Sequence, residues 1–266
     1  MMPSGLSTRG GRSGPRFGIW VKMSTIESTE IMAAAGFDFC VIDMEHTLLD
    51  TQTVYQQLVI GSALGVQMLV RVPDSAGAMI QRVLDAGASG VVVPHVDTAD
   101  DALRIAQACM FPPSGTRGSG GTSRLGRWGL RPRDQYLNDV GLCVPQIEST
   151  TAAENIQAIL DTPGVGSIML GPADLSLDHR RDAEGPSPEK LLETVRQAAR
   201  AVNIPVGTAC ALKDAEAAVQ LGYDFIVCGN DSSLLASSAR KTVAELQALG
   251  QGPYSSANAT GIKGVS

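Results

Sequence analysis

Eight short runs of mostly apolar, β-branched residues recur along the chain, and longer amphipathic segments separate them. The runs span 16–21, 39–43, 68–72, 90–95, 142–148, 167–172, 205–210 and 225–230. Most of them are continuous apolar stretches, which is typical of parallel strands that are covered on both faces. Eight repeats of strand and helix in one chain favour an α/β fold of the closed (β/α)8, or TIM barrel, type.

An open, doubly wound sheet is the main alternative fold. Such a sheet carries its glycine-rich dinucleotide-binding turn directly after the first strand. Here the glycine-rich stretch "STRGGRSG", residues 7–14, precedes the first predicted strand instead. The sequence therefore favours the barrel, and it gives no sign of an organic cofactor.

Signals for the starts and ends of helices support the same repeat. Helices are expected over 24–35, 50–64, 75–87 and 98–109, and the expected N-caps are Asp50, Ser75 and Thr98. The phrases "AGFDF", "AGASG" and "LGYDF" precede strands and put a glycine just past a helix, at Gly36, Gly87 and Gly222. A glycine at that position ends a helix in the left-handed conformation.

The chain of 266 residues suits a single barrel domain. We expect a flexible N-terminal segment over 1–15, the barrel over 16–249 and a disordered Gly/Ser-rich tail over 250–266. One connection, 111–138, is too long for an ordinary loop, so we expect it to be functional or mobile.

Composition excludes several classes of function. A net charge of −6 and an aromatic content of 4% argue against binding of nucleic acid. No apolar run approaches the roughly 18 residues that a membrane span needs, and the N-terminus lacks the apolar core of a secretory signal. Five cysteines without a CxxC pair suggest a reducing compartment. We therefore expect a cytoplasmic protein.

Polar residues follow the predicted strands at their carboxyl ends, where barrel enzymes build their active sites. The second strand ends in Asp43 and is followed by Glu45 and His46. The third, fifth and sixth strands contribute Arg71, Gln146, Glu148 and Asp174. This clustering predicts an active site at one end of the barrel.

Glu148 and Asp174 end neighbouring strands, so their carboxylates can converge. Two such carboxylates repel unless a proton or a cation lies between them. Mg²⁺ or Mn²⁺ accepts a carboxylate pair and keeps open positions for substrate. The alternative is that each acid only caps the helix that follows it.

The segment "GPADLS" adds an anion site. Gly171 and Pro172 form a tight turn, after which the amides of Ala173 and Asp174 can face a substrate carboxylate at a helix start. Arg71 lies within an apolar strand and needs an anionic partner, either an acid of the chain or an oxyanion of the substrate.

His46 has two acidic neighbours, Asp43 and Glu45, and a carboxylate partner orients an imidazole and raises its basicity. His46 is therefore a candidate general base. A Schiff-base mechanism would need a lysine in the site, and Lys22 is the one lysine near a predicted strand end. Metal chemistry suits the acidic residues better.

These segments together resemble the HpcH/HpaI family of metal-dependent (class II) aldolases that act on 2-keto acids. The resemblance covers about residues 16–248 and rests on six blocks in order: "AGFDFCVIDMEH", "VRVP", "LDAGASGVVVPHVDTADDA", "FPPSGTRG", "QIES" and "GPADLS". It implies reversible aldol cleavage of a 4-hydroxy-2-oxo acid to pyruvate and an aldehyde, through a metal-bound pyruvate enolate.

The resemblance also implies roles for individual residues. Metal binding falls to Glu148 and Asp174, with Mg²⁺, Mn²⁺ or Co²⁺ as the ion. Substrate binding falls to Arg71, Gln146, Gly171, Pro172, Ala173, Asp174 and, on the aldehyde side, Arg117. Catalysis falls to His46 as base, Asp43 as the group that orients it and Arg71 as the cation facing the enolate oxygen, with Glu45 supporting the site from behind.

The resemblance implies a homo-oligomer, a hexamer, in which a C-terminal helix over 231–248 packs on a neighbouring subunit. The sequence departs from the family at "TLLD", 47–50, and after "TRG", so the side of the site that faces the aldehyde differs. Three other functions share the predicted residues: oxaloacetate decarboxylation, cleavage of a CoA thioester and non-catalytic binding of a 2-keto acid.

Overall fold

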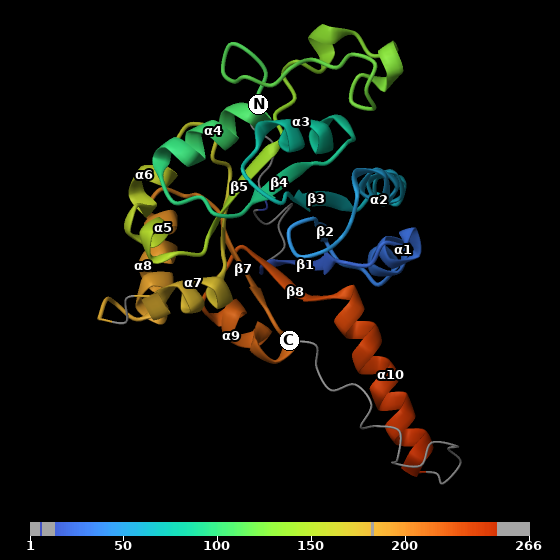
Figure 1. Ribbon diagram of the computed structural model, residues 1–266, viewed down its shortest axis with the longest axis vertical. Helices are drawn as coiled ribbons and strands as arrows, with labels where there is room; N and C mark the ends of the chain where they lie inside the picture. The colour runs from blue at the N-terminus through green and yellow to red at the C-terminus, as the bar shows by residue number, and fades with distance from the viewer. Residues whose placement is uncertain (1–5, 7–13, 182–183, 249–266) are drawn as a thin grey trace.

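The structure, a computed structural model, describes residues 6, 14–181 and 184–248, and it contains the predicted barrel (Figure 1). Eight parallel strands close in chain order, with β8 pairing to β1. They are β1 Arg16–Val21, β2 Phe39–Asp43, β3 Gln67–Arg71, β4 Gly90–Val93, β5 Leu142–Ile147, β6 Ile168–Leu170, β7 Val206–Cys210 and β8 Phe225–Asn230. The predicted tail, 250–266, and most of the predicted flexible segment, 1–15, lie outside the described residues.

Helices cover the outside of the barrel and run back against the strands (Figure 1). They are α1 Ile26–Ala34, α2 Thr51–Ala63, α3 Gly77–Asp85, α4 Ala99–Cys109, α5 Thr150–Glu154, α6 Ile156–Leu160, α7 Pro172–Asp178, α8 Pro188–Ala201, α9 Ala215–Gln220 and α10 Asp231–Ala248. No helix among the described residues is both long and apolar enough to cross a membrane.

Local capping explains most of these boundaries. Asp50 caps α2, and Thr98 forms a reciprocal capping box with Asp101 at the start of α4, as predicted. The three predicted helix-ending glycines adopt positive φ angles of 95°, 105° and 72°. The prediction for Ser75 is wrong: α3 begins at Gly77 after Ala76, because the Asp74 carboxylate accepts the Ala76 amide and turns the chain first.

The barrel has an inner core that fills its interior and an outer core between the strands and the helices. Inside, the rings of Phe39 and Phe225 meet edge to face with centroids 6.1 Å apart. Gly18 leaves the space for one of these rings, because a Cβ there would lie 2.3 Å from Phe39 Cε2. Leu6 of the N-terminal segment is buried in the same inner core.

The connection 111–138 follows α4 and contains two short 3-10 turns, Arg127–Gly129 and Arg133–Gln135. It is anchored to the end of α3, where the Leu125 amide donates to the Asp85 carbonyl at 3.1 Å. Because α3 runs back from the carboxyl ends of the strands, this connection lies at the opposite end of the barrel from the predicted site.

Substitution of Gly18 by alanine tests the packing inside the barrel. The added Cβ meets the buried Phe39 ring, so we expect Gly18→Ala to lower the free energy of unfolding by about 1–3 kcal/mol in urea denaturation. Gly77→Ala is the matched control, since its Cβ would meet only Ala108 at 3.6 Å. A Gly18→Ala midpoint at or above that of the wild type would contradict this packing.

Candidate active site

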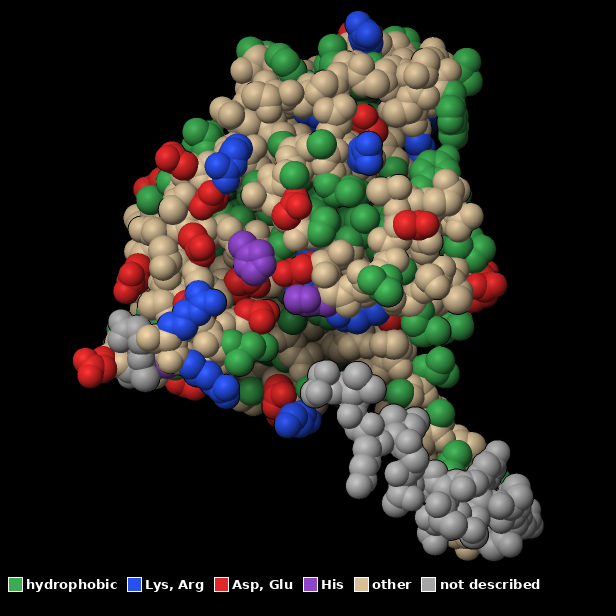
Figure 2. All heavy atoms as spheres, viewed as in Figure 1, with side chains coloured by type: hydrophobic (Ala, Val, Ile, Leu, Met, Phe, Trp, Pro, Cys, Tyr) green, Lys and Arg blue, Asp and Glu red, His purple; other side chains and the backbone are tan. Residues whose placement is uncertain are grey.

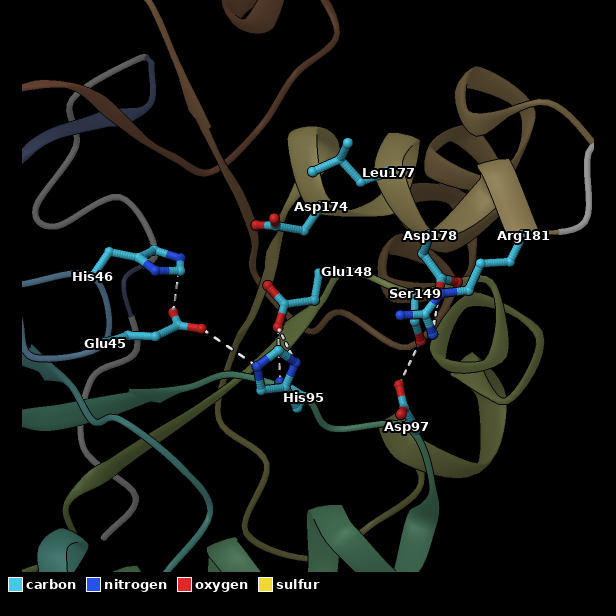
Figure 3. Close-up of a pocket in the computed structure, with 10 residues that line it drawn as sticks. All are labelled: Glu45, His46, His95, Asp97, Glu148, Ser149, Asp174, Leu177, Asp178 and Arg181. Carbon is cyan, nitrogen blue, oxygen red and sulfur yellow. Dashed lines mark hydrogen bonds and ion pairs between the residues drawn. The ribbon is translucent and has the colours of Figure 1, made fainter. Parts of the chain in front are cut away.

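A cavity of about 320 Å³ opens at the carboxyl ends of the strands. Figure 2 shows histidine and acidic side chains gathered on this face of the molecule, and Figure 3 shows how the lining side chains turn toward the cavity. The lining residues are Glu45, His46, His95, Asp97, Glu148, Ser149, Asp174, Leu177, Asp178 and Arg181. Four of the predicted site residues therefore line one space: Glu45, His46, Glu148 and Asp174.

A buried ion pair lies beside this cavity. The register of β2 and β3 sets Asp43 opposite Arg71, and the guanidinium donates to both carboxylate oxygens, from Nε at 2.9 Å and from Nη2 at 2.8 Å. The Trp20 ring lies under the guanidinium, 4.2 Å from its carbon. Lys22 Nζ is 2.5 Å from Asp43 Oδ2. Acids of the chain itself thus supply the anion that Arg71 requires.

Two cations hold Asp43 in its ionised form. Burial alone would raise its pKa, but the hydrogen bonds and charges of Arg71 and Lys22 outweigh burial and lower the pKa of Asp43 to about 2. The Lys22 ammonium is itself paired with Asp43. This pairing favours metal chemistry over a Schiff base at Lys22.

The structure corrects the expected partner of His46. Asp43 Oδ1 accepts the backbone amide of His46 at 3.3 Å and does not contact its ring. The ring nitrogen Nε2 instead lies 3.7 Å from Glu45 Oε2, and the His46 side chain is 55% exposed to solvent. Glu45 is therefore the carboxylate beside this imidazole, because both Asp43 oxygens are already bound by Arg71.

Glu45 is an integral part of the site. Its Oε2 lies 2.9 Å from Arg71 Nη1, so Arg71 is shared between the Glu45 and Asp43 carboxylates. Its other oxygen, Oε1, lies 3.5 Å from His95 Nε2. Glu45 thus connects the buried ion pair to the cavity.

Glu148, at the end of β5, is almost completely buried. One carboxylate oxygen accepts the His95 backbone amide at 2.8 Å, and the other accepts the side-chain amide of Gln146. Burial raises the pKa of Glu148, and the nearby charge of Glu45 adds to this, while the two hydrogen bonds act in the opposite direction. A cation close to Glu148 would stabilise its buried carboxylate in the ionised form.

The residues present fit a divalent cation. One ligand atom each from Glu45, His95 and Glu148 all lie within 4.8 Å of one another. Asp174, which the sequence pairs with Glu148, lies outside this close group but lines the same cavity from α7, next to Glu148 (Figure 3). Carboxylate oxygens are the ligands that Mg²⁺ and Mn²⁺ prefer.

The segment "GPADLS" forms a helix start at the cavity. Gly171 precedes α7, Pro172 is its first residue and no side chain caps the turn. The amides of Ala173 and Asp174, in the first turn, have no carbonyl partner within the helix. Gly171 also permits a close approach, because a Cβ there would lie 2.8 Å from Glu148 Cβ.

The structure also corrects the expected position of Arg117. Its guanidinium is buried, with Nη2 2.6 Å from Asp85 Oδ1 and its carbon 4.6 Å from the centre of the Phe111 ring. Asp85 ends α3 at the far end of the barrel, so Arg117 does not reach the cavity of its own chain. The sequence block that contains Arg117 does not show at which end of the barrel the long connection lies.

His95 is not among the site residues that the sequence predicts. It follows β4 and Pro94, and its left-handed backbone, with a φ of 56°, directs its amide at Glu148. Its ring lies between two carboxylates, with Nδ1 3.2 Å from Glu148 Oε1. Its place at the end of a strand is the sequence signal that marks it, since β4 neighbours β5.

Comparisons with known proteins agree with this geometry. The sequence profile described as HpcH/HpaI aldolase/citrate lyase matches residues 16–238. The 4-hydroxy-2-oxovalerate aldolase of Rhodococcus jostii is 36% identical over 226 residues, which cover 83% of this chain and 87% of that protein. The 2-keto-3-deoxy-L-rhamnonate aldolase of Shigella sonnei is 32% identical over 243 residues, which cover 90% of this chain and 91% of that protein.

Among solved structures, an HpcH/HpaI aldolase/citrate lyase family protein from Burkholderia cenocepacia superposes with a TM-score of 0.82 at 30% identity. The match covers 88% of this chain and 95% of that one. The profile spans most of the barrel, and the two aldolases are similar over most of their length. The chain belongs to the HpcH/HpaI aldolase/citrate lyase family.

Proposed function

We propose that this chain catalyses the reversible, metal-dependent aldol cleavage of a 4-hydroxy-2-oxo acid to pyruvate and an aldehyde. The observation that carries the proposal is the juxtaposition of the Asp43–Arg71–Glu45 group with the buried Glu148 carboxylate at one cavity. The relatives named above are aldolases of 2-oxo acids. A third, from Chromohalobacter salexigens and 36% identical, is a hydroxypyruvate/pyruvate aldolase.

Glu148 and Asp174 would hold the divalent cation, Mg²⁺ or Mn²⁺ with Co²⁺ as a further candidate. When bound, the ion supplies Lewis-acid stabilisation of the negative charge that develops on the keto oxygen of pyruvate. Gln146 fixes the orientation of Glu148 through its side-chain amide. No organic cofactor takes part.

Binding of the pyruvate half uses the start of α7. The amides of Ala173 and Asp174, which follow Gly171 and Pro172, would receive the substrate carboxylate. Arg71 contacts Glu45, which lines the same cavity, and its fixed positive charge would favour the enolate over the neutral keto form. Asp43 holds the guanidinium in one orientation through its two hydrogen bonds, so little reorganisation accompanies the reaction.

Proton transfer is assigned to His46. Its ring faces the cavity and is half-exposed, so a substrate proton or a water can reach Nε2. Glu45, rather than Asp43, is the carboxylate that supports a protonated His46 ring. In the cleavage direction His46 takes the proton of the 4-hydroxyl group as the C3–C4 bond breaks and the aldehyde forms. The protonated His46 then returns a proton to C3 of the enolate to give pyruvate.

The aldehyde half would occupy the outer part of the cavity. Leu177 and Arg181 are exposed residues of the cavity lining, and Leu48 of "TLLD" stands fully exposed on the loop after β2. Arg117 is not available there within one chain. The mixture of an apolar and a cationic side chain at the rim suits aldehydes with a hydrophobic or acidic end.

The proposal includes assembly into a homo-oligomer in the cytoplasm, with a hexamer as the expected form. Helix α10 projects away from the barrel (Figure 1), and only its first residue, Asp231, is buried. An isolated helix of this length is marginal in water, so a second subunit is expected to cover it. A mainly apolar groove of about 300 Å³ beside it is lined by Ile31, Met32, Leu234 and Leu235, among others.

A substrate panel tests the reaction. We expect pyruvate release from 4-hydroxy-2-oxo acids with Mg²⁺ or Mn²⁺, and loss of that release after treatment with EDTA and its return when metal is restored. Oxaloacetate and malyl-type thioesters are the comparison substrates. Faster turnover of either comparison substrate would show that aldol cleavage is not the main reaction. Activity that survives EDTA but is lost on borohydride treatment with pyruvate would instead indicate a Schiff base on Lys22.

Replacing Arg71 by lysine tests its electrostatic role. Lysine keeps the charge but cannot hold Asp43 and Glu45 together, so we expect kcat for cleavage to fall about 10²- to 10³-fold. Arg104→Lys, on the exposed surface of α4, is the matched control and should keep its activity. Thermal melting checks that both variants fold. An Arg71→Lys enzyme within about threefold of the wild type would contradict this role.

Charge on α10 tests the assembly. We expect the double substitution Leu234→Glu and Leu235→Glu to reduce the mass measured by light scattering, because two carboxylates would be buried in an apolar contact. Leu212→Glu, at a leucine outside α10 that is more exposed than Leu234 and Leu235, is the control. An unchanged mass in the double variant, or a monomeric wild type, would contradict assembly through this face.

A further inference from the structure

We infer that His95 is a direct nitrogen ligand of the divalent cation, so that the site prefers borderline transition metals to Mg²⁺. The inference rests on the proposed function, because it concerns the same ion that Glu148 is proposed to hold. It extends the carboxylate pair, Glu148 and Asp174, to a mixed oxygen and nitrogen set. The observations that carry it are the position of the His95 ring, its exposure and the burial of its neighbours.

The first observation is the spacing of the donor atoms. His95 Nδ1 lies 3.2 Å from Glu148 Oε1, and His95 Nε2 lies 3.5 Å from Glu45 Oε1. Two donors that are each about 2.1 Å from one ion lie about 3 Å apart when they meet at a right angle. The ring nitrogen and the Glu148 oxygen are thus already at the separation that a shared ion requires.

The second observation is the backbone that presents the ring. His95 has a left-handed conformation, and its amide donates to the same Glu148 oxygen that its ring approaches. The pairing of Val93 with Pro145 fixes the end of β4 beside the end of β5. The strand register and this hydrogen bond therefore hold the Cα of His95 next to Glu148, whichever rotamer the ring adopts.

The third observation separates a ligand from a structural ion pair. The His95 side chain is 72% exposed, whereas Glu148 and Glu45 are only 4% and 9% exposed. A solvated imidazole at such distances adds little stability as a partner of a carboxylate. Glu45 Oε2 is paired with Arg71 Nη1 at 2.9 Å, so the oxygen of Glu45 that faces the His95 ring is Oε1. The buried carboxylates of Glu45 and Glu148, with the accessible His95 ring beside them, are suited to binding an ion.

A nitrogen ligand changes the choice of metal. Imidazole suits Co²⁺, Ni²⁺ and Zn²⁺, whereas Mg²⁺ prefers oxygen ligands and keeps its waters. We therefore expect metal-free protein to bind Co²⁺ and Zn²⁺ more tightly than Mg²⁺ by several orders of magnitude, and His95 to account for part of the difference.

The test uses calorimetric titration of the metal-free full chain with Co²⁺ and, separately, with Mg²⁺. His95→Asn is the main variant, because asparagine tolerates the left-handed backbone and keeps a polar side chain. We expect it to weaken Co²⁺ binding about 100-fold and to change Mg²⁺ binding less than about threefold. His95→Gln, which is closer to histidine in length, should behave in the same way.

A spectroscopic readout identifies the ligand without any activity measurement. The chain has three histidines, His46, His95 and His179. We expect the pulsed EPR spectrum of the Mn²⁺-loaded protein to show nitrogen coupling that His95→Asn removes and that His46→Ala and His179→Ala retain. Absence of this coupling in the wild type, its survival in His95→Asn, or equal losses of Co²⁺ and Mg²⁺ affinity would overturn the inference.

A further variant separates this inference from the proposed function. Glu148→Gln should abolish tight binding of both ions, since Glu148 belongs to the proposed metal site with or without His95. If Glu148→Gln abolishes binding and His95→Asn leaves it unchanged, the inference fails while the proposed metal site stands. If Glu148→Gln leaves binding intact, the proposed metal site fails as well.

Discussion

The buried ion pair between Asp43 and Arg71 is the interaction on which the mouth of the barrel depends. Breaking a buried pair by removing one partner costs about 3–5 kcal/mol, because the remaining charge is left without compensation. Here the guanidinium is fixed by two hydrogen bonds, by the Trp20 ring and by Glu45. That arrangement keeps Asp43 ionised and fixes the Arg71 guanidinium in one place. Glu45 is positioned by its contact with the same guanidinium.

The two sides of the site differ in how their acidic residues are neutralised. On the side of β2 and β3, cationic Arg71 and Lys22 balance Asp43 and Glu45. On the side of β5 and α7, Glu148 is buried, and its described side-chain contacts are with Gln146 and His95 rather than with a lysine or an arginine. A divalent cation would complete the second side as Arg71 completes the first. Charge from both sides would then meet at the keto oxygen of a bound 2-oxo acid.

The barrel and the end at which its active site lies could be predicted from the sequence, because short local patterns of apolar residues specify the strands. All eight strands form within a few residues of the apolar runs, since parallel strands that are covered on both sides must be apolar throughout. Residues at strand ends, such as Glu148, were therefore also placed correctly at the mouth. Side-chain partners were not: Asp43 contacts Arg71 rather than the His46 ring, and Arg117 lies at the far end. Such choices depend on register and on long connections, which local patterns do not encode.

Exchange of the methyl protons of pyruvate for deuterium is the measurement that tests the central claim most directly. It reports enolate formation without any aldehyde, and mass spectrometry follows it in D₂O. The account predicts that wild-type protein with Mg²⁺ or Mn²⁺ exchanges these protons, and that His46→Ala slows the exchange about 10²- to 10⁴-fold. Exchange at the wild-type rate in His46→Ala, or no exchange by a wild-type protein that cleaves 4-hydroxy-2-oxo acids, would contradict it.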